Sequence, residues 1–134
     1  MTTLGRILIV DDEPQVGFML REILTELGYV AKTAVRGAEA LQLVPVFQPD
    51  VVLLDLNMPG MSGVEVLDHL RREQPMLPIV VITGNTDVDV ARATLVRGAF
   101  DYLRKPFDID ALARVVAAAV VMGPSGNPTS DAAR

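Results

Sequence analysis

Cysteine is absent from the 134-residue sequence, and aromatic residues are scarce. Without cysteine the chain forms neither disulfides nor thiolate metal sites, which is compatible with a reducing compartment, and we expect a cytoplasmic location. The two tyrosines and four phenylalanines form no series, and the 12 basic residues, set against 17 acidic ones, form no block. With a net charge of -5, this balance argues against direct binding of DNA or RNA by this domain.

A membrane-spanning segment is also lacking. The longest apolar stretch, IDALARVVAAAVVM at residues 109–122, is interrupted by Asp110 and Arg114. A bilayer-spanning helix needs about 20 consecutive apolar residues, so this stretch is too short and too polar. No apolar signal segment precedes the first strand-like run, and we expect no association with a membrane.

What the sequence does contain is the pattern of a folded globular domain. Half of the residues are hydrophobic and 22% are charged, and the length fits one domain. Three short runs are apolar throughout, as is typical of strands buried on both faces of a parallel sheet: ILIV (7–10), VVLL (51–54) and IVVI (79–82). Two weaker strands, at 29–34 and 99–103, carry Lys32 and Asp101, and such charges suit the edges of a sheet.

Apolar residues at helical spacing separate these strands. The predicted helices cover residues 14–27, a segment that begins near residue 36, and residues 62–74, 86–97 and 108–122. Pro14 suits the first turn of a helix, and Pro45 should end or kink the second helix early. Ser62 and Glu65 have the spacing of a capping box.

Strand and helix therefore alternate five times along the chain. This alternation predicts an α/β domain with a parallel sheet and right-handed crossovers. We assign residues 4–122 to this domain. Residues 123–134 are rich in Gly, Pro and Ser and lack a core pattern, so we expect a flexible tail or a linker stub there.

The candidate site residues are polar and come just after the predicted strands. They are Asp11 and Asp12, Asp55, Thr83 and Lys105. In an open parallel sheet these positions share one edge, where ligands bind. Three close carboxylates repel one another and need a cation, and oxygen ligands without Cys or His favour a hard ion such as Mg²⁺. Thr83 and Lys105 suit the oxygens of a phosphoryl group. Together these are the parts for phosphoryl transfer onto an aspartate.

Each of these residues alone has a plainer explanation. An Asp-Asp pair before proline is commonly a turn and helix cap, and Asp55 and Thr83 each precede turn-forming residues. The plain explanations weaken because all of these residues occupy corresponding places in the alternating pattern. A calcium loop in DLNMPGMSGVEV fails because Pro59 and Val66 stand where oxygen ligands are needed. A flavin or nucleotide site is disfavoured, since the first loop has two acids where a phosphate needs glycines.

Taken together, the segments ILIVDDEP, VVLLDLNMPGMSG, ITG and GAFDYLRKPF make the chain resemble a response regulator receiver domain of two-component phosphorelay signalling. The resemblance covers about residues 4–122, with the segments in family order and near family spacing. It implies a flavodoxin-like (βα)5 fold, which is a three-layer sandwich around a five-stranded parallel sheet of order 2-1-3-4-5.

Carried over residue by residue, the resemblance implies that Asp55 is the phosphoacceptor. Asp12 would ligate Mg²⁺ directly, with Asp11 close by and acting through water. Asp55 and the backbone carbonyl of Asn57 would complete the protein ligands. The side chains of Asn57 and Asn85 stand where the family tunes hydrolysis of the phosphoaspartate.

The same resemblance implies roles around the phosphoryl group. Lys105 would contact that group, and the peptide bond between Lys105 and Pro106 is expected to be cis. Thr83 would be the switch hydroxyl that moves toward a phosphoryl oxygen. Tyr102 matches the switch aromatic that rotates inward behind it.

The function implied is that of a phosphoacceptor switch. A sensor histidine kinase or a phosphotransfer protein would pass its phosphoryl group to Asp55, and the face formed by the fourth helix, fifth strand and fifth helix would change. Such a domain catalyses only its own phosphorylation and dephosphorylation and is not otherwise an enzyme. The alternatives are a Mg²⁺-dependent aspartyl-phosphate phosphatase for external substrates, in which an acid is usual where Asn57 stands, and a scaffold that is never phosphorylated.

The last helix predicts a contact surface of its own. Between Ile109 and Met122 only Asp110 and Arg114 are charged. A helix that is apolar on nearly all sides needs more cover than one face of a sheet supplies. We therefore expect a partner surface there, or a homodimer.

Overall fold

Five short strands form one parallel sheet in the computed structural model, which describes residues 3–58, 60–84 and 88–122. The strands are β1 (Arg6–Val10), β2 (Val30–Ala34), β3 (Val51–Asp55), β4 (Ile79–Thr83) and β5 (Asp101–Arg104). Their order is β2-β1-β3-β4-β5, so the predicted flavodoxin-like topology is confirmed. The apolar runs form the three central strands, and the strands that carry Lys32 and Asp101 lie at the edges, as predicted.

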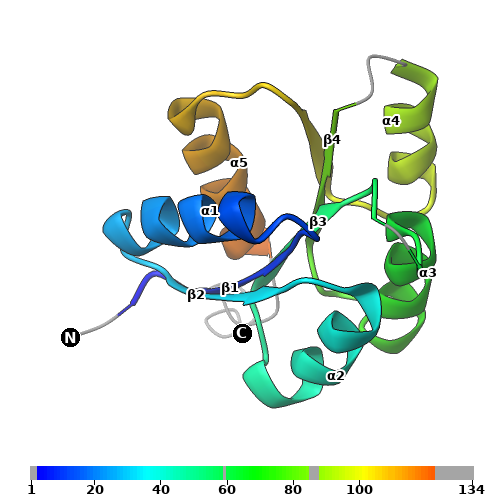
Figure 1. Ribbon diagram of the computed structural model, residues 1–134, viewed down its shortest axis with the longest axis horizontal. Coiled ribbons are helices and arrows are strands. Elements are labelled where there is room, and N and C mark those ends of the chain that lie inside the picture. The colour runs from blue at the N-terminus through cyan, green and yellow to red at the C-terminus, as the bar shows by residue number, and fades with distance from the viewer. Residues whose placement is uncertain (1–2, 59, 85–87, 123–134) are drawn as a thin grey trace, which may run out of the picture.

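Helices cover both faces of this sheet (Figure 1). They are α1 (Pro14–Glu26), α2 (Gly37–Phe47), α3 (Gly63–Glu73), α4 (Val88–Val96) and α5 (Ile109–Met122). In β1, Ile7 and Ile9 pack against α1 and α5, whereas Leu8 and Val10 pack on the side of α2 and α3. A strand whose side chains are buried alternately in two clusters must be apolar throughout, which explains the unbroken ILIV run.

The helix boundaries agree with most of the predicted signals. Pro14 is the first residue of α1, and the helix ends before Gly28. The capping box of α3 is present, because the Glu65 N–H donates to Ser62 Oγ at 3.2 Å and the Ser62 N–H donates to Glu65 Oε1 at 3.0 Å. The start predicted for the fourth helix and the tail at 123–134 lie outside the described residues.

Pro45 does not end α2 early, and that prediction is wrong. The helix continues to Phe47 and closes with the Gln48 N–H donating to the Val44 carbonyl at 2.9 Å. Pro45 is exposed, and Leu41, whose carbonyl loses its helical donor, is partly exposed. The interruption falls in the last turn, and water can satisfy this carbonyl without unwinding the helix.

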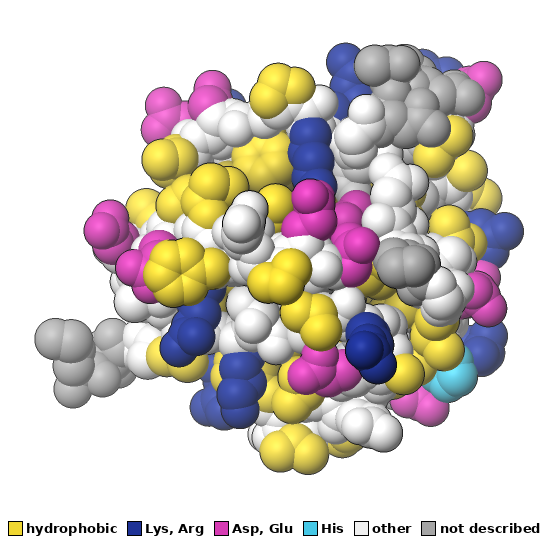
Figure 2. Space-filling model, in the orientation of Figure 1, with side chains coloured by type: hydrophobic (Ala, Val, Ile, Leu, Met, Phe, Trp, Pro, Cys, Tyr) yellow, Lys and Arg dark blue, Asp and Glu magenta, His cyan; other side chains and the backbone are white. Residues whose placement is uncertain are grey.

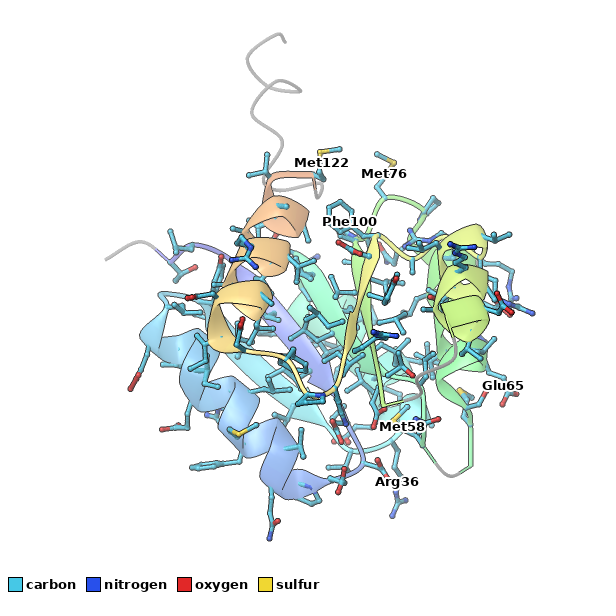
Figure 3. The ribbon with its side chains drawn as sticks, turned by 90° about the horizontal axis from the view of Figure 1, so that it is seen from above. Arg36, Met58, Glu65, Met76, Phe100 and Met122 are labelled. Atoms are coloured by element: carbon cyan, nitrogen blue, oxygen red, sulfur yellow. The ribbon has the colours of Figure 1, made fainter. Side chains whose placement is uncertain are left out.

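The parallel register brings the carboxyl ends of the strands to one edge of the sheet. Val10 pairs with both Ala34 and Leu54, and Thr83 pairs with Arg104. Figure 3 shows Met58, just beyond β3, and Met122, at the end of α5, at opposite ends of the molecule. Among the described residues, no helix is long and apolar enough to cross a membrane.

Candidate functional site

Three carboxylates meet at the carboxyl edge of the sheet. Asp11 and Asp12 follow β1, and Asp55 is the last residue of β3. Each offers a carboxylate oxygen, and these oxygens lie within 4.8 Å of one another. Asp11 is 2% exposed and Asp55 is 3% exposed, so two of the three acids are shielded from water.

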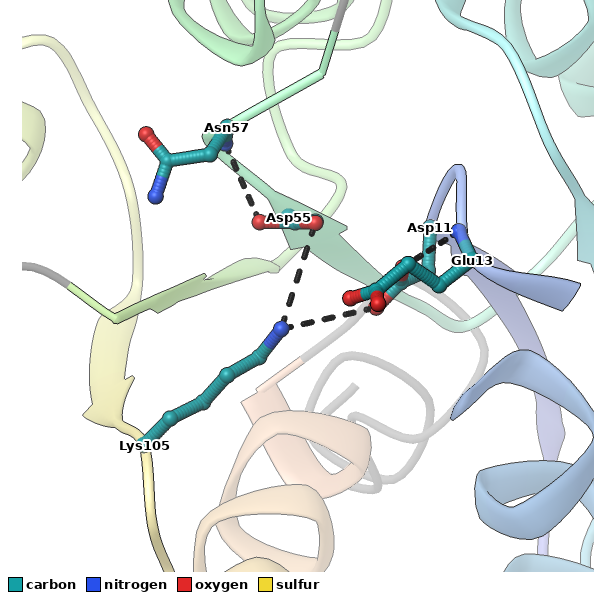
Figure 4. Close-up of polar contacts among 5 residues, drawn as sticks. All are labelled: Asp11, Glu13, Asp55, Asn57 and Lys105. Atoms are coloured by element: carbon teal, nitrogen blue, oxygen red, sulfur yellow. Dashed lines mark hydrogen bonds and ion pairs between the residues drawn. The ribbon is translucent and has the colours of Figure 1, made fainter. Parts of the chain in front are cut away.

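Among the described residues, the cation that faces these acids is Lys105, which directly follows β5 (Figure 4). The Nζ atom of Lys105 lies 3.8 Å from Asp11 Oδ2 and 4.0 Å from Asp55 Oδ2. Lys105 is held at this edge because its backbone N–H donates to the Thr83 carbonyl at 2.8 Å. A single ammonium group does not balance three carboxylates, so the site has an excess of negative charge.

Backbone hydrogen bonds fix one oxygen of each buried acid. The Glu13 N–H donates to Asp11 Oδ1 at 2.9 Å, and the Asn57 N–H donates to Asp55 Oδ1 at 3.0 Å (Figure 4). Burial raises the pKa of Asp11 and of Asp55 above the ordinary value, and this effect outweighs the hydrogen bonds and Lys105, which lower both. The second oxygens, both Oδ2, are the ones that face Lys105.

The donor set fits a hard divalent cation. Within the part of the chain that the structure describes, the buried Oδ2 atom of Asp11 has no hydrogen-bond partner. A buried carboxylate oxygen without a donor is costly unless a cation approaches it. Oxygen ligands in this number are typical of Mg²⁺, which keeps several waters and binds through a few carboxylates.

Comparison with known sequences decides the family. The sequence model of the response regulator receiver domain matches residues 7–117, which is most of the chain. The chain belongs to the response regulator receiver family. The predicted resemblance is thereby confirmed.

Relatives and solved structures agree with this assignment. The receiver domain is 39% identical over 116 residues to the DNA-binding transcriptional regulator NtrC of Escherichia coli (strain K12), covering 87% of this chain and 25% of NtrC. It is 45% identical to the transcriptional regulatory protein KdpE of Mycobacterium tuberculosis, covering 84% of this chain and 50% of KdpE. The crystal structure of the receiver domain of NtrX from Brucella abortus superposes with a TM-score of 0.82 at 34% identity, covering 85% of this chain and 97% of that one. The chain thus spans about a quarter of the first curated relatives it matches.

The structure describes all but one of the other predicted site residues of this receiver domain. Thr83 ends β4 and is 1% exposed. Asn57 is exposed beside Asp55. Tyr102 lies in the edge strand β5, half-buried against the cluster that α2 and α3 share. The Lys105–Pro106 peptide bond is cis, as expected, and Asn85 lies outside the described residues.

Sequence reasoning missed two features of the receiver site. Glu13 received no role in the sequence analysis, yet its backbone N–H orients the Asp11 carboxylate. Gly63 stands in the segment VVLLDLNMPGMSG that carries the resemblance but received no role, although it packs directly on the end of β3. The available signal for Gly63 was its place at the first helical position after the Ser62 cap, where glycine has no propensity advantage over most residues.

An apolar hollow adjoins the acids. It has a volume of about 310 Å³ and is lined by Glu13, Val16, Met19, Lys105, Pro106 and Phe107. On the nearby surface of α1, Phe18 is 62% exposed and Met19 is 51% exposed. Figure 2 shows acidic and basic side chains together near the middle of this view, with hydrophobic side chains around them. Exposed apolar groups beside a charged site are typical of a surface that binds a protein.

Proposed function

We propose that this receiver domain accepts a phosphoryl group on Asp55 and acts as a signalling switch. The observation that carries the proposal is the geometry of Asp55. Its carboxylate lies at the end of a central strand, with Oδ1 held by the Asn57 N–H and Oδ2 4.0 Å from Lys105 Nζ. Oδ2 is therefore the oxygen oriented for attack on phosphorus.

The transfer can be written with its bonds balanced. The phosphodonor is a phosphohistidine of a histidine kinase or of a phosphotransfer protein. A bond forms between Asp55 Oδ2 and phosphorus while the bond from phosphorus to the histidine nitrogen breaks, and the nitrogen keeps the electron pair. Lys105 neutralises part of the negative charge that the phosphoryl oxygens carry during transfer.

Mg²⁺ would be held by Asp11, Asp12 and Asp55 together with the Asn57 carbonyl, and it would neutralise charge on the phosphoryl group. The residues of the chain do the rest. The raised pKa values of Asp11 and Asp55 reflect their burial, and a bound divalent cation favours the ionised forms of both. The excess of negative charge in the domain alone therefore suits metal binding.

The switch follows from the change in charge at Asp55. Phosphorylation replaces one negative charge by nearly two and adds three acceptor oxygens. Thr83 ends the neighbouring strand β4, and we propose that its hydroxyl moves toward a phosphoryl oxygen while Tyr102 turns inward. Only contacts that differ between the two states can shift their balance, and these two side chains supply them.

The partners follow from the surroundings of the site. The exposed Phe18 and Met19 and the apolar hollow beside Lys105 suit a protein phosphodonor, which must cover this edge to reach Asp55. NtrC is a DNA-binding regulator of which this chain covers 25%, and we propose a regulator of that kind for this domain. With its net charge of -5, the receiver would leave DNA contact to another part of such a protein. Because the chain is similar to a transcriptional regulator, we also propose a cytoplasmic location.

A Mg²⁺ titration with radiolabelled acetyl phosphate tests the proposed function. We expect the domain to take up a stable label at one residue, with uptake that rises with Mg²⁺ and is lost in chelator. Continuous release of phosphate from other phosphate esters, without a labelled domain, would instead favour the external phosphatase. A chain that neither takes up label nor releases phosphate would favour the scaffold and contradict the proposal.

We also propose that the domain self-associates through α4, β5 and α5. Part of the prediction from the last helix is explained by burial, because Leu112, Val115, Val116 and Ala119 pack on the sheet. Large apolar groups nevertheless stay exposed at the ends of α4 and α5, with Val96 at 89% and Met122 at 61%. Figure 3 shows β5 between α4 and α5, so these helices flank one surface.

Sedimentation of two charged variants tests self-association. Val96→Asp places a carboxylate on α4, and Val46→Asp is its control on α2, where Val46 is 77% exposed. We expect the wild type and Val46→Asp to show a concentration-dependent rise in sedimentation coefficient that phosphorylation increases. Val96→Asp should stay monomeric, because an unpaired charge buried in an apolar contact costs several kcal/mol. A wild type that is monomeric at every concentration, with and without phosphodonor, would contradict the proposal.

A further inference from the structure

The loop that carries Asn57 is fixed on both sides. The Leu56 N–H donates to the Ile82 carbonyl at 3.0 Å, and the Leu56 carbonyl accepts from the Gly63 N–H at 3.3 Å. Leu56 and Met58 are buried in the same cluster, and Asn57 is exposed between them. The direction of the Asn57 carbonyl therefore depends on how the Leu56 backbone is held.

Gly63 lies where a side chain does not fit. It is the first residue of α3 and is buried. A Cβ atom at this position would lie 2.5 Å from Leu56 Cα and 2.6 Å from the carbonyl oxygen of Asp55. Both are backbone atoms at the end of a central strand, and they cannot rotate away as a side chain can. Any side chain at position 63 must therefore move the start of α3 or the end of β3.

We propose that Gly63 is a positioning residue for the metal site. Because it lacks a side chain, α3 closes directly on the end of β3, and this contact holds Asp55 and the Asn57 carbonyl in place. The inference rests on the proposed function, since it requires that the domain binds Mg²⁺ at these residues. Gly63 itself contacts neither the metal nor the phosphoryl group and acts through Leu56 and Asp55.

Gly37 provides a matched control. It is the first residue of α2 and is buried, and a Cβ atom there would lie 2.5 Å from Val66 Cγ2. That atom, like Cβ and Cγ of Met61 at 3.3 Å, belongs to a side chain and not to the backbone of β3. An alanine at position 37 therefore strains the packing of two helices while it leaves the Leu56 backbone in position.

The experiment titrates Mg²⁺ into wild type, Gly63→Ala and Gly37→Ala and follows backbone amide signals by NMR, with circular dichroism to monitor folding. We expect Gly63→Ala to bind Mg²⁺ about 10–100-fold more weakly than wild type, which is the usual effect of losing support behind a metal ligand. Gly37→Ala should bind Mg²⁺ within about twofold of wild type. Its strain lies in the contact between α2 and α3, and changes at separate contacts have independent effects. Equal affinity of wild type and Gly63→Ala would overturn the inference, as would an equal loss in both variants. A wild type that binds no Mg²⁺ would overturn the proposed function and the inference with it.

Amide hydrogen exchange in the wild type gives a second readout that needs no substitution. It tests whether Gly63 supports the metal site even if Gly63→Ala does not fold. Suppose that the contact between Gly63 and Leu56 strengthens Mg²⁺ binding. Linkage then requires that bound Mg²⁺ stabilises this contact by the same free energy. The reference is the Ala40 amide, which donates to the Arg36 carbonyl at 3.1 Å in the first turn of α2. We expect saturating Mg²⁺ to slow exchange at Gly63 about tenfold more than at Ala40. Equal slowing at the two amides, or none at Gly63, would overturn the inference.

Discussion

Asp55→Asn is expected to lower stable phosphoryl incorporation from acetyl phosphate and Mg²⁺ to background. The amide retains an oxygen for the Asn57 N–H, which donates to Asp55 Oδ1 at 3.0 Å, so the local fold should persist. It removes the negative oxygen that faces Lys105 at 4.0 Å and would form the bond to phosphorus. Intact-protein mass spectrometry after incubation measures the fraction that carries one phosphoryl group.

Asp50→Asn is the matched control for this substitution. Asp50 is also buried, at 6% exposed, and directly precedes the strand that Asp55 ends. Its Oδ2 accepts the Arg6 N–H at 2.8 Å at the opposite edge of the sheet. We expect Asp50→Asn to take up phosphoryl groups as the wild type does. Undiminished incorporation in Asp55→Asn would refute the assignment of the phosphoacceptor, and equal loss in both variants would show a general effect on folding.

The division into central and edge strands, and the edge on which the acids meet, could be predicted from residue patterns in the sequence, whereas the full strand order was implied by the family resemblance. ILIV and IVVI must be buried on two faces, and Lys32 and Asp101 mark the edges. Once the strands are parallel, whatever follows each strand lies at the same edge. For that reason the sequence alone places Asp11, Asp12 and Asp55 together, as the structure does.

Other features depend on distances between segments that are far apart in sequence. Pro45 is tolerated because its side of α2 is exposed, and burial of that side was not readable from the helix alone. Position 63 requires glycine because the backbone of Leu56 and Asp55 lies against it in the folded loop. This close approach is not visible in the local sequence. The buried Asp11 Oδ2 without a donor likewise becomes visible only when its surroundings are known.

The second large effect concerns the stability of the domain in chelator. Asp11→Asn is expected to raise the free energy of unfolding at neutral pH by about 1–2 kcal/mol, the range of single stabilising substitutions. Asp11 is 2% exposed, and burial is the main cause that raises its pKa above the ordinary value. The native surroundings therefore disfavour the ionised carboxylate, in spite of Lys105 at 3.8 Å. An amide in its place retains an acceptor for the Glu13 N–H and carries no charge.

The sign of the pH dependence follows from the same raised pKa values. Where a carboxyl group has a higher pKa in the folded than in the unfolded state, the folded state binds more protons between the two values. The stability of the wild type in chelator should therefore fall as pH rises from about 3.8 through the raised pKa values of Asp11 and Asp55, and then level off. The fall should be smaller in Asp11→Asn, since one of the two groups no longer titrates. Urea unfolding across this pH range measures both curves.

Mg²⁺ should reverse the order of the two proteins. The wild type is expected to gain about 2.7 kcal/mol at a Mg²⁺ concentration 100-fold above its dissociation constant, whereas Asp11→Asn should gain much less. Asp50→Asn serves again as the control, with the opposite sign in chelator, because a charge-assisted hydrogen bond to the Arg6 N–H is weakened and about 1 kcal/mol is lost. Two results would contradict the idea that Asp11 lowers stability but is needed to bind Mg²⁺. One is that Asp11→Asn is less stable than the wild type in chelator, and the other is that Mg²⁺ stabilises Asp11→Asn as much as the wild type. The two Asp→Asn substitutions are thus expected to change the free energy of unfolding in chelator in opposite directions. This difference distinguishes Asp50, which stabilises the fold, from Asp11, which binds the metal.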